Sequence, residues 1–407
     1  MGIVDKIKEI EDEIKRTQKN KATEGHLGLL KAKLAKLRTQ LLEPDSSGAK
    51  GEGFDVKKSG DARVVLIGFP SVGKSTLLST ITDTKSVAAG YEFTTLTCIP
   101  GVIHYNGTNI QLLDLPGIIE GAARGEGRGK QVIAVAKSAD LVLMVLDALR
   151  EREQHHREIL ERELRTVGLR LNQSPPNITF KKKATGGIVF TSTVTNTKLG
   201  ADPRKTVERI CKEYKFHNCE ILMREDYGVD ELIDVIEGNR HYVKCVYVYN
   251  KIDQVTIEHV DQLARQQHTV VMSCIPQLGI DGLLRAVWRY LGLVRIYTKR
   301  QGQPPDLSDP VVLTKGRGGL TVRAAVTQIH RSLLDTFKFA VVWGSSVKFS
   351  PQRVGLDHVL EDEDVMQIVK KTVLEERHSK NYSQKVQAFY DNYHEKKSGG
   401  KKKPLKS

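Results

Sequence analysis

The chain contains few cysteines, and no two of them form a C-x-x-C pair. Five of its 407 residues are cysteine, and they are scattered along the sequence as Cys98, Cys211, Cys219, Cys245 and Cys274. This spacing argues against a disulfide framework and against a zinc module. It is typical of proteins in a reducing cytosol, so we expect a cytoplasmic location and no disulfide-linked partner.

Long hydrophobic runs are also missing. No apolar stretch approaches the ~18 residues that a membrane-spanning helix requires. The first residues, Met1–Lys6, lack the apolar region of a secretory signal. Gly2 suggests myristoylation, but Lys6 stands where that motif needs Ser or Thr. We therefore expect no membrane partner.

Negative charge is scarce relative to positive charge. The sequence has 63 Lys and Arg against 49 Asp and Glu, which gives a net charge of +14. A basic balance favours a polyanionic partner, most often nucleic acid. We expect RNA or a ribonucleoprotein; the alternative is a well-solvated surface with a basic tail.

One glycine-rich segment is present that carries specific chemistry. Gly68–Ser75 fits the phosphate-loop pattern G-x-x-x-x-G-K-[ST]. The apolar stretch 63–68 before it predicts a buried strand, and 75–81 after it predicts a helix, which is the geometry that binds phosphate at a helix N-terminus. The alternative is a chance turn. The predicted phosphate-loop residues are Gly68, Pro70, Ser71, Val72, Gly73, Lys74, Ser75 and Thr76.

A second motif distinguishes guanine from adenine. Asn250-Lys-Ile-Asp253 follows a predicted strand, and a carboxylate at Asp253 would accept two hydrogen bonds from guanine N1–H and its exocyclic amine. Adenine lacks that donor pair, which disfavours an ATPase. Asn250 would contact the base edge and support the phosphate loop, and the Lys251 stem would pack over the ring. Ser273 and Cys274 suit a loop whose backbone meets guanine O6; a capped turn is the alternative for the tetrapeptide.

Residues between these motifs suit Mg²⁺ and the γ-phosphate. Asp114 would hold Mg²⁺ through water, and the Gly117 N–H would contact the γ-phosphate. Ser75 and Thr95 would supply hydroxyl ligands to Mg²⁺, with Thr95 chosen over Thr94. Lys74, Thr95 and Gly117 are the predicted catalytic residues.

The residue after Gly117 departs from the usual small GTPase. Ile118 stands where a water-orienting Gln is expected, and isoleucine cannot orient water. We expect slow intrinsic hydrolysis, with water positioned by a partner, a monovalent cation or another loop. Residues 119–130 contain four glycines and predict a switch loop rather than a plain linker; Arg124 and Arg128 would neutralise charge there or simply be solvated.

Further patterns predict the domain organisation. Residues 1–48 predict a helical hairpin with one apolar stripe per arm, and the Lys and Arg of the second arm could also meet a phosphate backbone. Strands are predicted at 63–68, 101–106, 109–114 and 140–147, with the sheet resuming at 245–250 and 269–273 and a helix at 280–291. An insertion at 172–238 holds two strands and a helix at 203–213. A smaller unit to about 371 contains one helix, 322–337, and the tail 372–407 is predicted to be disordered.

Together these motifs resemble a known family. Gly68–Ser75, Tyr91–Leu96, Asp114–Ala122 and Asn250–Asp253 resemble the Obg-like branch of translation-factor-type GTPases. Within that branch, Arg16–Thr23 and His26–Lys36 look like the developmentally regulated GTP-binding proteins. Gly51–Val56 and Ser59–Arg63 look closer to the second member of that subfamily than to the first.

The resemblance implies an α/β fold: a P-loop GTPase domain (61–295) with an N-terminal helical hairpin, an inserted small α+β domain and a C-terminal β-grasp TGS domain (296–371). It also implies GTP/GDP and Mg²⁺ as cofactors, association with ribosomes or with rRNA or tRNA, and a dedicated regulatory protein partner. Some relatives respond to potassium through an Asn in the phosphate loop, where this chain has Ser71. A second hypothesis is an RNA- or ribosome-binding adaptor whose nucleotide is largely structural.

Overall fold

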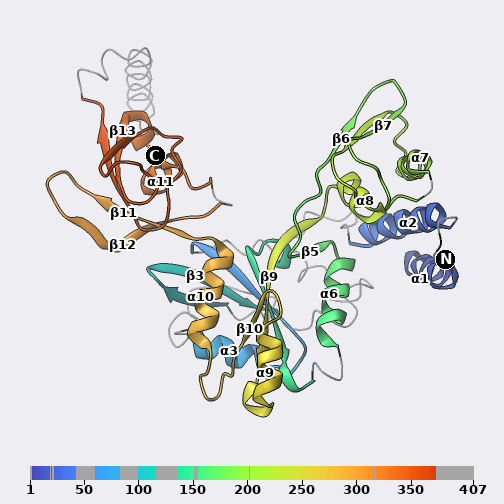
Figure 1. The fold of residues 1–407 in the computed structure, drawn as a ribbon, viewed down its shortest axis with the longest axis horizontal. Coiled ribbons are helices and arrows are strands. Elements are labelled where there is room, and N and C mark those ends of the chain that lie inside the picture. Colours follow the sequence, from blue (N-terminus) through green and yellow to red (C-terminus); the bar gives the residue numbers. More distant parts are fainter. Residues whose placement is uncertain are drawn as a thin grey trace, which may run out of the picture. The chain divides into compact units, whose positions relative to one another are not determined.

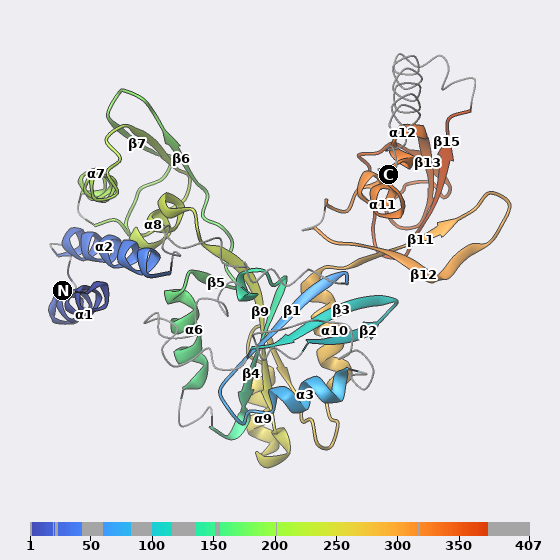
Figure 2. The same ribbon diagram turned by 180° about the vertical axis from the view of Figure 1, so that it is seen from behind.

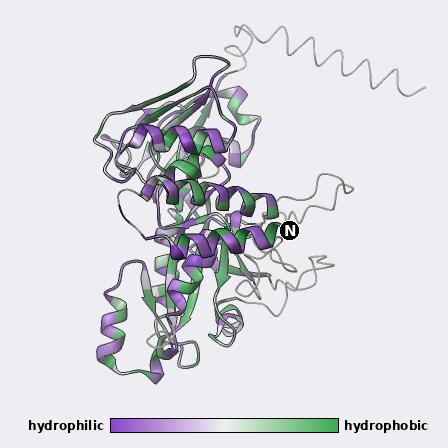
Figure 3. Ribbon diagram, turned by 90° about the vertical axis from the view of Figure 1, so that its right-hand side faces the viewer, coloured by the Kyte–Doolittle hydropathy of each residue, from purple (hydrophilic) through white to green (hydrophobic). Residues whose placement is uncertain are grey.

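The computed structural model describes residues 2–18, 20, 23–42, 60–82, 100–115, 135–150, 155–200, 202–315 and 318–372. The described residues fall into two compact units, one within 1–291 but without 106–108, and the other within 292–372 together with 106–108. Within the described residues, no helix has both the length and the apolar character needed to span a bilayer. Helices in Figure 3 alternate purple and green along their length, as amphipathic helices do.

A seven-stranded sheet forms the centre of the first unit (Figure 1). Its order is β10-β9-β4-β1-β3-β2, with β5 also paired to β9, and every registered pair among these strands is parallel. The strands are β1 (Ala62–Ile67), β2 (Pro100–Tyr105), β3 (Thr108–Asp114), β4 (Leu141–Asp147), β5 (Leu169–Leu171), β9 (His241–Asn250) and β10 (Thr269–Val271). The strands predicted from the apolar runs are confirmed, and β5 is a strand that the patterns did not predict.

Helices lie on both sides of this sheet (Figures 1 and 2). Leu160, Leu164 and Leu263 join the main cluster of buried residues with Val65 and Met144 of the sheet. Because both faces are covered, β1 and β4 are buried at every position, as parallel strands in α/β folds are. The described helices of this part are α3 (Lys74–Ile81), α6 (His156–Thr166), α9 (Ile257–Ala264) and α10 (Ile280–Leu291). A short 3₁₀ turn, η2 (Ile252–Gln254), lies between β9 and α9.

An inserted three-stranded sheet separates β5 from β9. Strand order is β6-β8-β7, with β8 antiparallel to β6 and parallel to β7. Two helices cover one face of it around a separate apolar core. The elements are β6 (Ile178–Lys182), β7 (Ile188–Ser192), α7 (Pro203–Glu213), β8 (Cys219–Met223) and α8 (Val229–Glu237). The helix predicted at 203–213 is confirmed, while β8 and α8 were not predicted.

The N-terminal hairpin, α1 (Ile3–Arg16) and α2 (Glu24–Leu42), packs on this inserted module. Ala32 is fully buried in the core of the insertion, and its carbonyl accepts a hydrogen bond from the Tyr214 hydroxyl at 3.2 Å. Thr39 donates to Glu237 at 2.9 Å. Helix α2 therefore buries two sides, one against α1 and one against α7 and α8 (Figure 2).

This packing occupies most of the basic side chains of α2. Lys31 pairs with Asp230 at 2.9 Å, Lys36 donates to the Glu213 carbonyl at 3.0 Å, and Arg38 pairs with Glu11 at 2.6 Å. Of the four Lys and Arg in the helix only Lys33 has no such partner among the described residues. Three of the four basic side chains of α2 thus bind partners within the chain. This argues against the alternative that α2 contacts a nucleic-acid phosphate backbone.

The second unit is a mixed five-stranded sheet with order β12-β11-β15-β13-β14. Its elements are β11 (Val294–Lys299), β12 (Pro305–Leu313), α11 (Val322–Ile329), α12 (Leu333–Thr336), β13 (Phe337–Trp343), β14 (Gln352–Val354) and β15 (Asp364–Lys370). The prediction of one helix over 322–337 is wrong. The helix ends where His330 adopts an extended backbone, and Phe337 already belongs to β13.

Candidate nucleotide-binding site

Four central strands end at the same edge of the parallel sheet. The register pairs Leu66 with Asp114 and Asp147 with Asn250, so the ends of β1, β3, β4 and β9 lie in one row. In open α/β sheets ligands bind outside the carboxyl ends of the strands. The residues predicted from the motifs therefore meet at the edge where such a fold binds its ligand.

The segment between β1 and α3 approaches neighbouring backbone closely. A Cβ on Gly68 would collide with the Val145 carbonyl, and one on Gly73 would collide with the Asn250 side chain. Gly73 also has φ +95°, and Ser71 has φ +62°, in the left-handed region that glycine adopts more readily. No side chain caps α3, whose first residue is Lys74. The loop thus presents an uncapped helix N-terminus, which favours an anion.

Lys74 lies across this loop. Its ammonium donates to the carbonyls of Gly68 at 2.9 Å and Phe69 at 2.8 Å. Burial lowers the pKa of Lys74, and the negative charge of Asp114 partly opposes that shift. A half-buried ammonium with only carbonyl partners gains strongly from an anion, and a phosphate would supply one.

Asp114 and Ser75 form a polar pair beside Lys74. The Ser75 hydroxyl donates to Asp114 Oδ2 at 3.1 Å. The other oxygen, Asp114 Oδ1, is buried and has no hydrogen-bond partner among the described residues. Such an orphaned carboxylate oxygen beside a hydroxyl is the donor set that a hydrated Mg²⁺ prefers, so these residues fit that ion.

Asn250 connects the two halves of the site. Its side chain is almost fully buried, and Nδ2 donates to the Val72 carbonyl of the phosphate loop at 2.9 Å. Its Oδ1 accepts from the backbone N–H of Lys251 at 2.8 Å and of Cys274 at 3.2 Å. One amide therefore fixes the phosphate loop and both segments predicted to meet the base.

Lys251 has two hydrogen-bond partners, neither of which the motifs predicted. Its ammonium donates to the Ser71 carbonyl at 2.9 Å and to Asp147 Oδ2 at 2.8 Å. Burial alone would raise the pKa of Asp147, but the hydrogen bonds from Lys251 and from the Leu149 N–H bring it below the usual value. The sequence signal that could have identified Asp147 is its position as an acidic residue at the carboxyl end of a continuous apolar strand, β4.

Asp253 follows Lys251 in the η2 turn. Its Oδ1 accepts a short hydrogen bond from the Ser273 hydroxyl, and Ser273 is almost fully buried. Cys274, also buried, is held through its N–H on Asn250. The structure thus brings Asn250, Asp253, Ser273 and Cys274 together, as the motif order predicts.

A second unpredicted contact supports the phosphate loop from α6. The ring of His156 stacks on Phe69 with centroids 4.1 Å apart and planes at 31°. Burial, together with the charge of Arg150, lowers the pKa of His156, while Asp147 acts in the opposite direction. A neutral imidazole packed under the loop is consistent with this environment.

Only some of the remaining predicted site residues lie within the described part of the chain. Pro70 and Thr76 are exposed on the loop and on α3, and Val72 is buried. Thr95, Gly117, Ile118, Arg124 and Arg128 lie outside the described residues. The described residues thus include the phosphate loop and the segments 250–253 and 273–274, and the predicted switch lies outside them.

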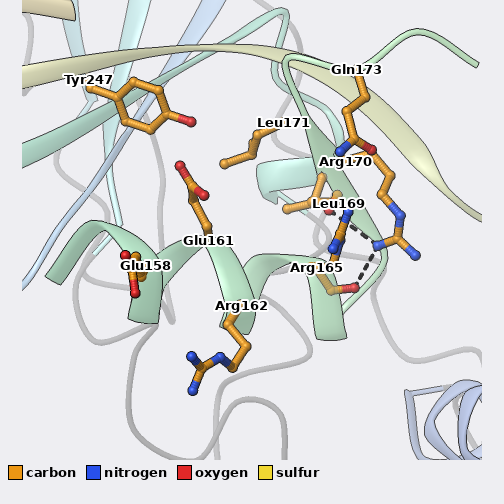
Figure 4. Close-up of a pocket in the computed structure, with 9 residues that line it drawn as sticks. All are labelled: Glu158, Glu161, Arg162, Arg165, Leu169, Arg170, Leu171, Gln173 and Tyr247. Carbon is orange, nitrogen blue, oxygen red and sulfur yellow. Dashed lines mark hydrogen bonds between the residues drawn. The ribbon is translucent and has the colours of Figure 1, made fainter. Parts of the chain in front are cut away.

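A cavity of about 290 Å³ lies elsewhere, between α6 and β5 (Figure 4). Its lining includes Glu158, Glu161, Arg162, Arg165 and Arg170. The Glu161 carboxylate points toward Tyr247 and the Arg162 guanidinium points away from it, while Arg170 donates to the Arg165 carbonyl at 2.7 Å. None of the predicted site residues lines it. Its mixed charges do not define a ligand class.

Three family models match the chain in succession. A 50S ribosome-binding GTPase model matches residues 63–182, a model of the C-terminal region of the same domain matches 185–293, and a TGS domain model matches 294–370. The P-loop GTPase fold and the TGS domain expected from the sequence are thus confirmed.

Whole-length relatives match more closely still. Developmentally-regulated G-protein 2 of Arabidopsis thaliana is 62% identical over 377 residues, covering 92% of this chain and 93% of the relative. Developmentally-regulated GTP-binding protein 2 of Homo sapiens is 63% identical over 372 residues, covering 91% of this chain and 100% of the relative. GTP-binding protein 1 of Schizosaccharomyces pombe is 57% identical over 372 residues, with 91% and 100% covered. With its phosphate loop, base-reading motif and TGS domain in this order, the chain belongs to the family of developmentally regulated GTP-binding proteins.

Proposed function

We propose that the chain binds GTP at the carboxyl edge of its parallel sheet and hydrolyses it to GDP and phosphate, as a slow, ribosome-associated switch in translation. The observation that carries the proposal is Asn250, whose amide joins the Val72 carbonyl to the Lys251 and Cys274 amides. A side chain that joins the phosphate loop to the loop predicted to contact the base suits a ligand that carries both phosphates and a base.

Lys74 and the start of α3 would stabilise the phosphates. On binding, the Lys74 ammonium would leave the Gly68 and Phe69 carbonyls for the β- and γ-phosphates, where charge develops during transfer. Ser75, Asp114 and Thr95 would hold Mg²⁺, which supplies charge neutralisation when bound. The Gly117 N–H would contact the γ-phosphate.

Asp253 would select guanine. Its carboxylate can accept from N1–H and the exocyclic amine, and Ser273 holds it in place through Oδ1. Lys251, fixed between Ser71 and Asp147, would cover the base. Asp253 is exposed in the structure, and a bound base would cover its carboxylate. A base without the donor pair would leave that covered carboxylate unpaired, at a cost of about 1–3 kcal/mol.

Ile118 favours a slow intrinsic rate of GTP hydrolysis and also favours a second candidate function. Without a water-orienting side chain at that position, the bound nucleotide would have a mainly structural role in an RNA- or ribosome-binding adaptor. We propose a ribosomal or RNA partner, a family-type regulatory protein and a cytoplasmic location in either case. The net charge of +14 supports the nucleic-acid partner.

The test compares two asparagines on the same sheet. Asn250→Ala removes the link between the loops, whereas Asn172→Ala removes two equivalent side-chain bonds to the Cys245 backbone, at 2.9 and 2.7 Å, away from the site. Titration with a fluorescent GDP analogue should show about 10- to 100-fold weaker binding for Asn250→Ala, from bonds of about 1 kcal/mol each. Equal losses in both variants would overturn the proposed role of Asn250.

Ribosome co-sedimentation separates the switch from the adaptor. A switch should associate differently when loaded with GDP or with a non-hydrolysable GTP analogue, and Lys74→Ala should abolish that difference. Association that ignores the nucleotide and survives Lys74→Ala would favour the adaptor.

A further inference from the structure

In the part of the chain that the structure describes, helices cover one face of the TGS-domain β-sheet and leave the other face uncovered. Helix α11 packs on Ile296, Ala340, Val342 and Met366, all of which are buried. Side chains alternate along a strand, so residues between these positions face the other way. They are only half-buried, and no described helix covers them.

Three aromatic residues lie on this uncovered face. Tyr297 of β11 pairs with Val365 of β15, and Val365 pairs with Trp343 of β13, so the three side chains form one row. Phe339, four residues before Trp343 on β13, lies on the same face beside Val369. We call Tyr297, Phe339 and Trp343 together the aromatic face.

Two cations lie over the aromatic face. The Lys299 ammonium is 4.7 Å from the centroid of the Trp343 ring, and the Arg353 guanidinium is 4.9 Å from that of Phe339. Neither cation has an ion-pair partner in the part of the chain that the structure describes, whereas Arg295 on the same strand as Lys299 pairs with Asp362 and Glu363. Lys and Arg stems are flexible, so both cations can leave the rings for an incoming anion.

We propose that the aromatic face binds single-stranded RNA. Bases stack on aromatic rings whatever their sequence, and neighbouring Lys and Arg contact the phosphates between them. An uncovered sheet with two or three aromatic side chains is a geometry that supports this mode. Lys299 and Arg353 lie over the rings until RNA bases replace them, and then pair with the phosphates of the RNA backbone.

The chemistry favours single strands over other partners. A duplex keeps its bases stacked inside, so it would use the two cations but not the rings. A protein helix would need a larger apolar surface without cations over it. The inference rests on the proposed association with RNA and names its contact surface; it does not depend on GTP hydrolysis.

The experiment measures binding of the full-length chain to a labelled single-stranded RNA dodecamer and to a duplex of the same sequence. Trp343→Ala should weaken single-strand binding about fivefold or more, as expected for loss of one stacked base, and Trp343→Phe should retain most of it. Arg353→Glu should weaken binding and flatten its salt dependence.

Two control variants are matched on the same domain. Phe349 is a 75% exposed aromatic residue in the loop after β13, and Arg323 is an exposed arginine on α11, the covered side. Phe349→Ala and Arg323→Glu should leave RNA binding unchanged. Thermal unfolding of each variant shows whether the domain remains folded, and Arg353→Glu together with the fluorescence measurement keeps the proposal testable if Trp343→Ala does not fold.

Tryptophan fluorescence reports stacking directly. The chain has two tryptophans, so Trp288→Phe leaves Trp343 as the only emitter. Single-stranded RNA should quench that emission, and duplex RNA should not. Equal affinity for duplex and single strand, no quenching, or equal loss in the controls would overturn the proposal. Loss of a protein partner with unchanged RNA binding would make the face a protein-docking surface, while nucleotide-dependent ribosome association would still stand.

Discussion

The two sheets of this protein differ in how they are covered and in where they carry chemistry. In β1 of the GTPase domain, consecutive residues such as Val64 and Val65 are both fully buried, because helices cover both faces. In β13 of the TGS domain, Val342 is fully buried while its neighbour Val341 faces the uncovered side. The candidate site of the first sheet is made by polar groups where its strands end, whereas the second sheet carries polar and aromatic groups across a face.

The difference determines what each sheet can recognise. Strand ends bring together a few side chains such as Asp114, Asp147 and Asn250, which suits a small ligand with several distinct groups. An open face presents repeated aromatic and basic side chains, which suits an extended polymer. Three sets of substitutions test this comparison.

The largest effect is expected at the strand ends. Gly73→Ala places a methyl group against Asn250, which three hydrogen bonds hold in place, and forces alanine to φ +95°. We expect nucleotide affinity to fall about 100-fold, which corresponds to about 2.7 kcal/mol. Isothermal titration with GDP measures it.

Gly186→Ala is the matched control. Gly186 has φ +104° but nothing within 4 Å of an added Cβ, so the substitution carries only the backbone strain. It should reduce stability by about 1–2 kcal/mol and leave GDP affinity unchanged. Undiminished affinity in Gly73→Ala would remove the strand ends as the binding site.

An effect of intermediate size, on the free energy of unfolding, should distinguish the two sheets when neighbouring residues of one strand are compared. Val64→Ala and Val65→Ala should each cost about 2 kcal/mol, because each leaves a cavity in a covered face. Val342→Ala should cost a similar amount, but Val341→Ala well under 1 kcal/mol. Urea unfolding of the four variants measures this; equal costs for Val341 and Val342 would mean that the uncovered face is buried in solution.

The smallest effect concerns pH. His156 has a lowered pKa in the folded chain, so the unfolded chain binds a proton that the folded chain does not as pH falls below about 6.5. Stability should therefore decrease as pH falls from 6.5 to the folded pKa. His156→Phe keeps a ring against Phe69 and removes this titration.

Thermal unfolding at pH 7.5 and 5.5 compares the variants. The loss of stability on acidification should be smaller in His156→Phe than in the parent chain, with the remainder shared by His241, whose pKa burial also lowers. His217→Gln, at an exposed position, should leave the loss unchanged. An unchanged loss in His156→Phe would show that the imidazole is not buried as described.

Local patterns predicted the parts of the fold whose signals are local. The run before Gly68 and the run ending at Asp147 are continuous and apolar, so their strands were identified with bounds within one or two residues. Asn250, Lys251 and Asp253 were found together because one motif contains them. The break at His330 was missed because apolar residues continue on both sides of it.

Long-range contacts could not be predicted in this way. Lys31 meets Asp230, Thr39 meets Glu237, and both pairs are about two hundred residues apart in sequence. Asp147 and His156 were missed as site residues because their roles depend on which strands and helices are neighbours. A single aspartate or histidine carries no spacing signal of its own.

The docking of α2 on the insertion has a consequence for biosynthesis. Proteins emerge from the ribosome N-terminus first, and domains generally fold as they appear. Helix α2 is complete by Leu42, but the surface that buries Ala32 includes α8, which ends at Glu237. The hairpin must therefore wait, with one apolar side of α2 uncovered, while almost two hundred further residues are translated. During that interval the uncovered side of this helix is apolar surface of the kind that chaperones bind.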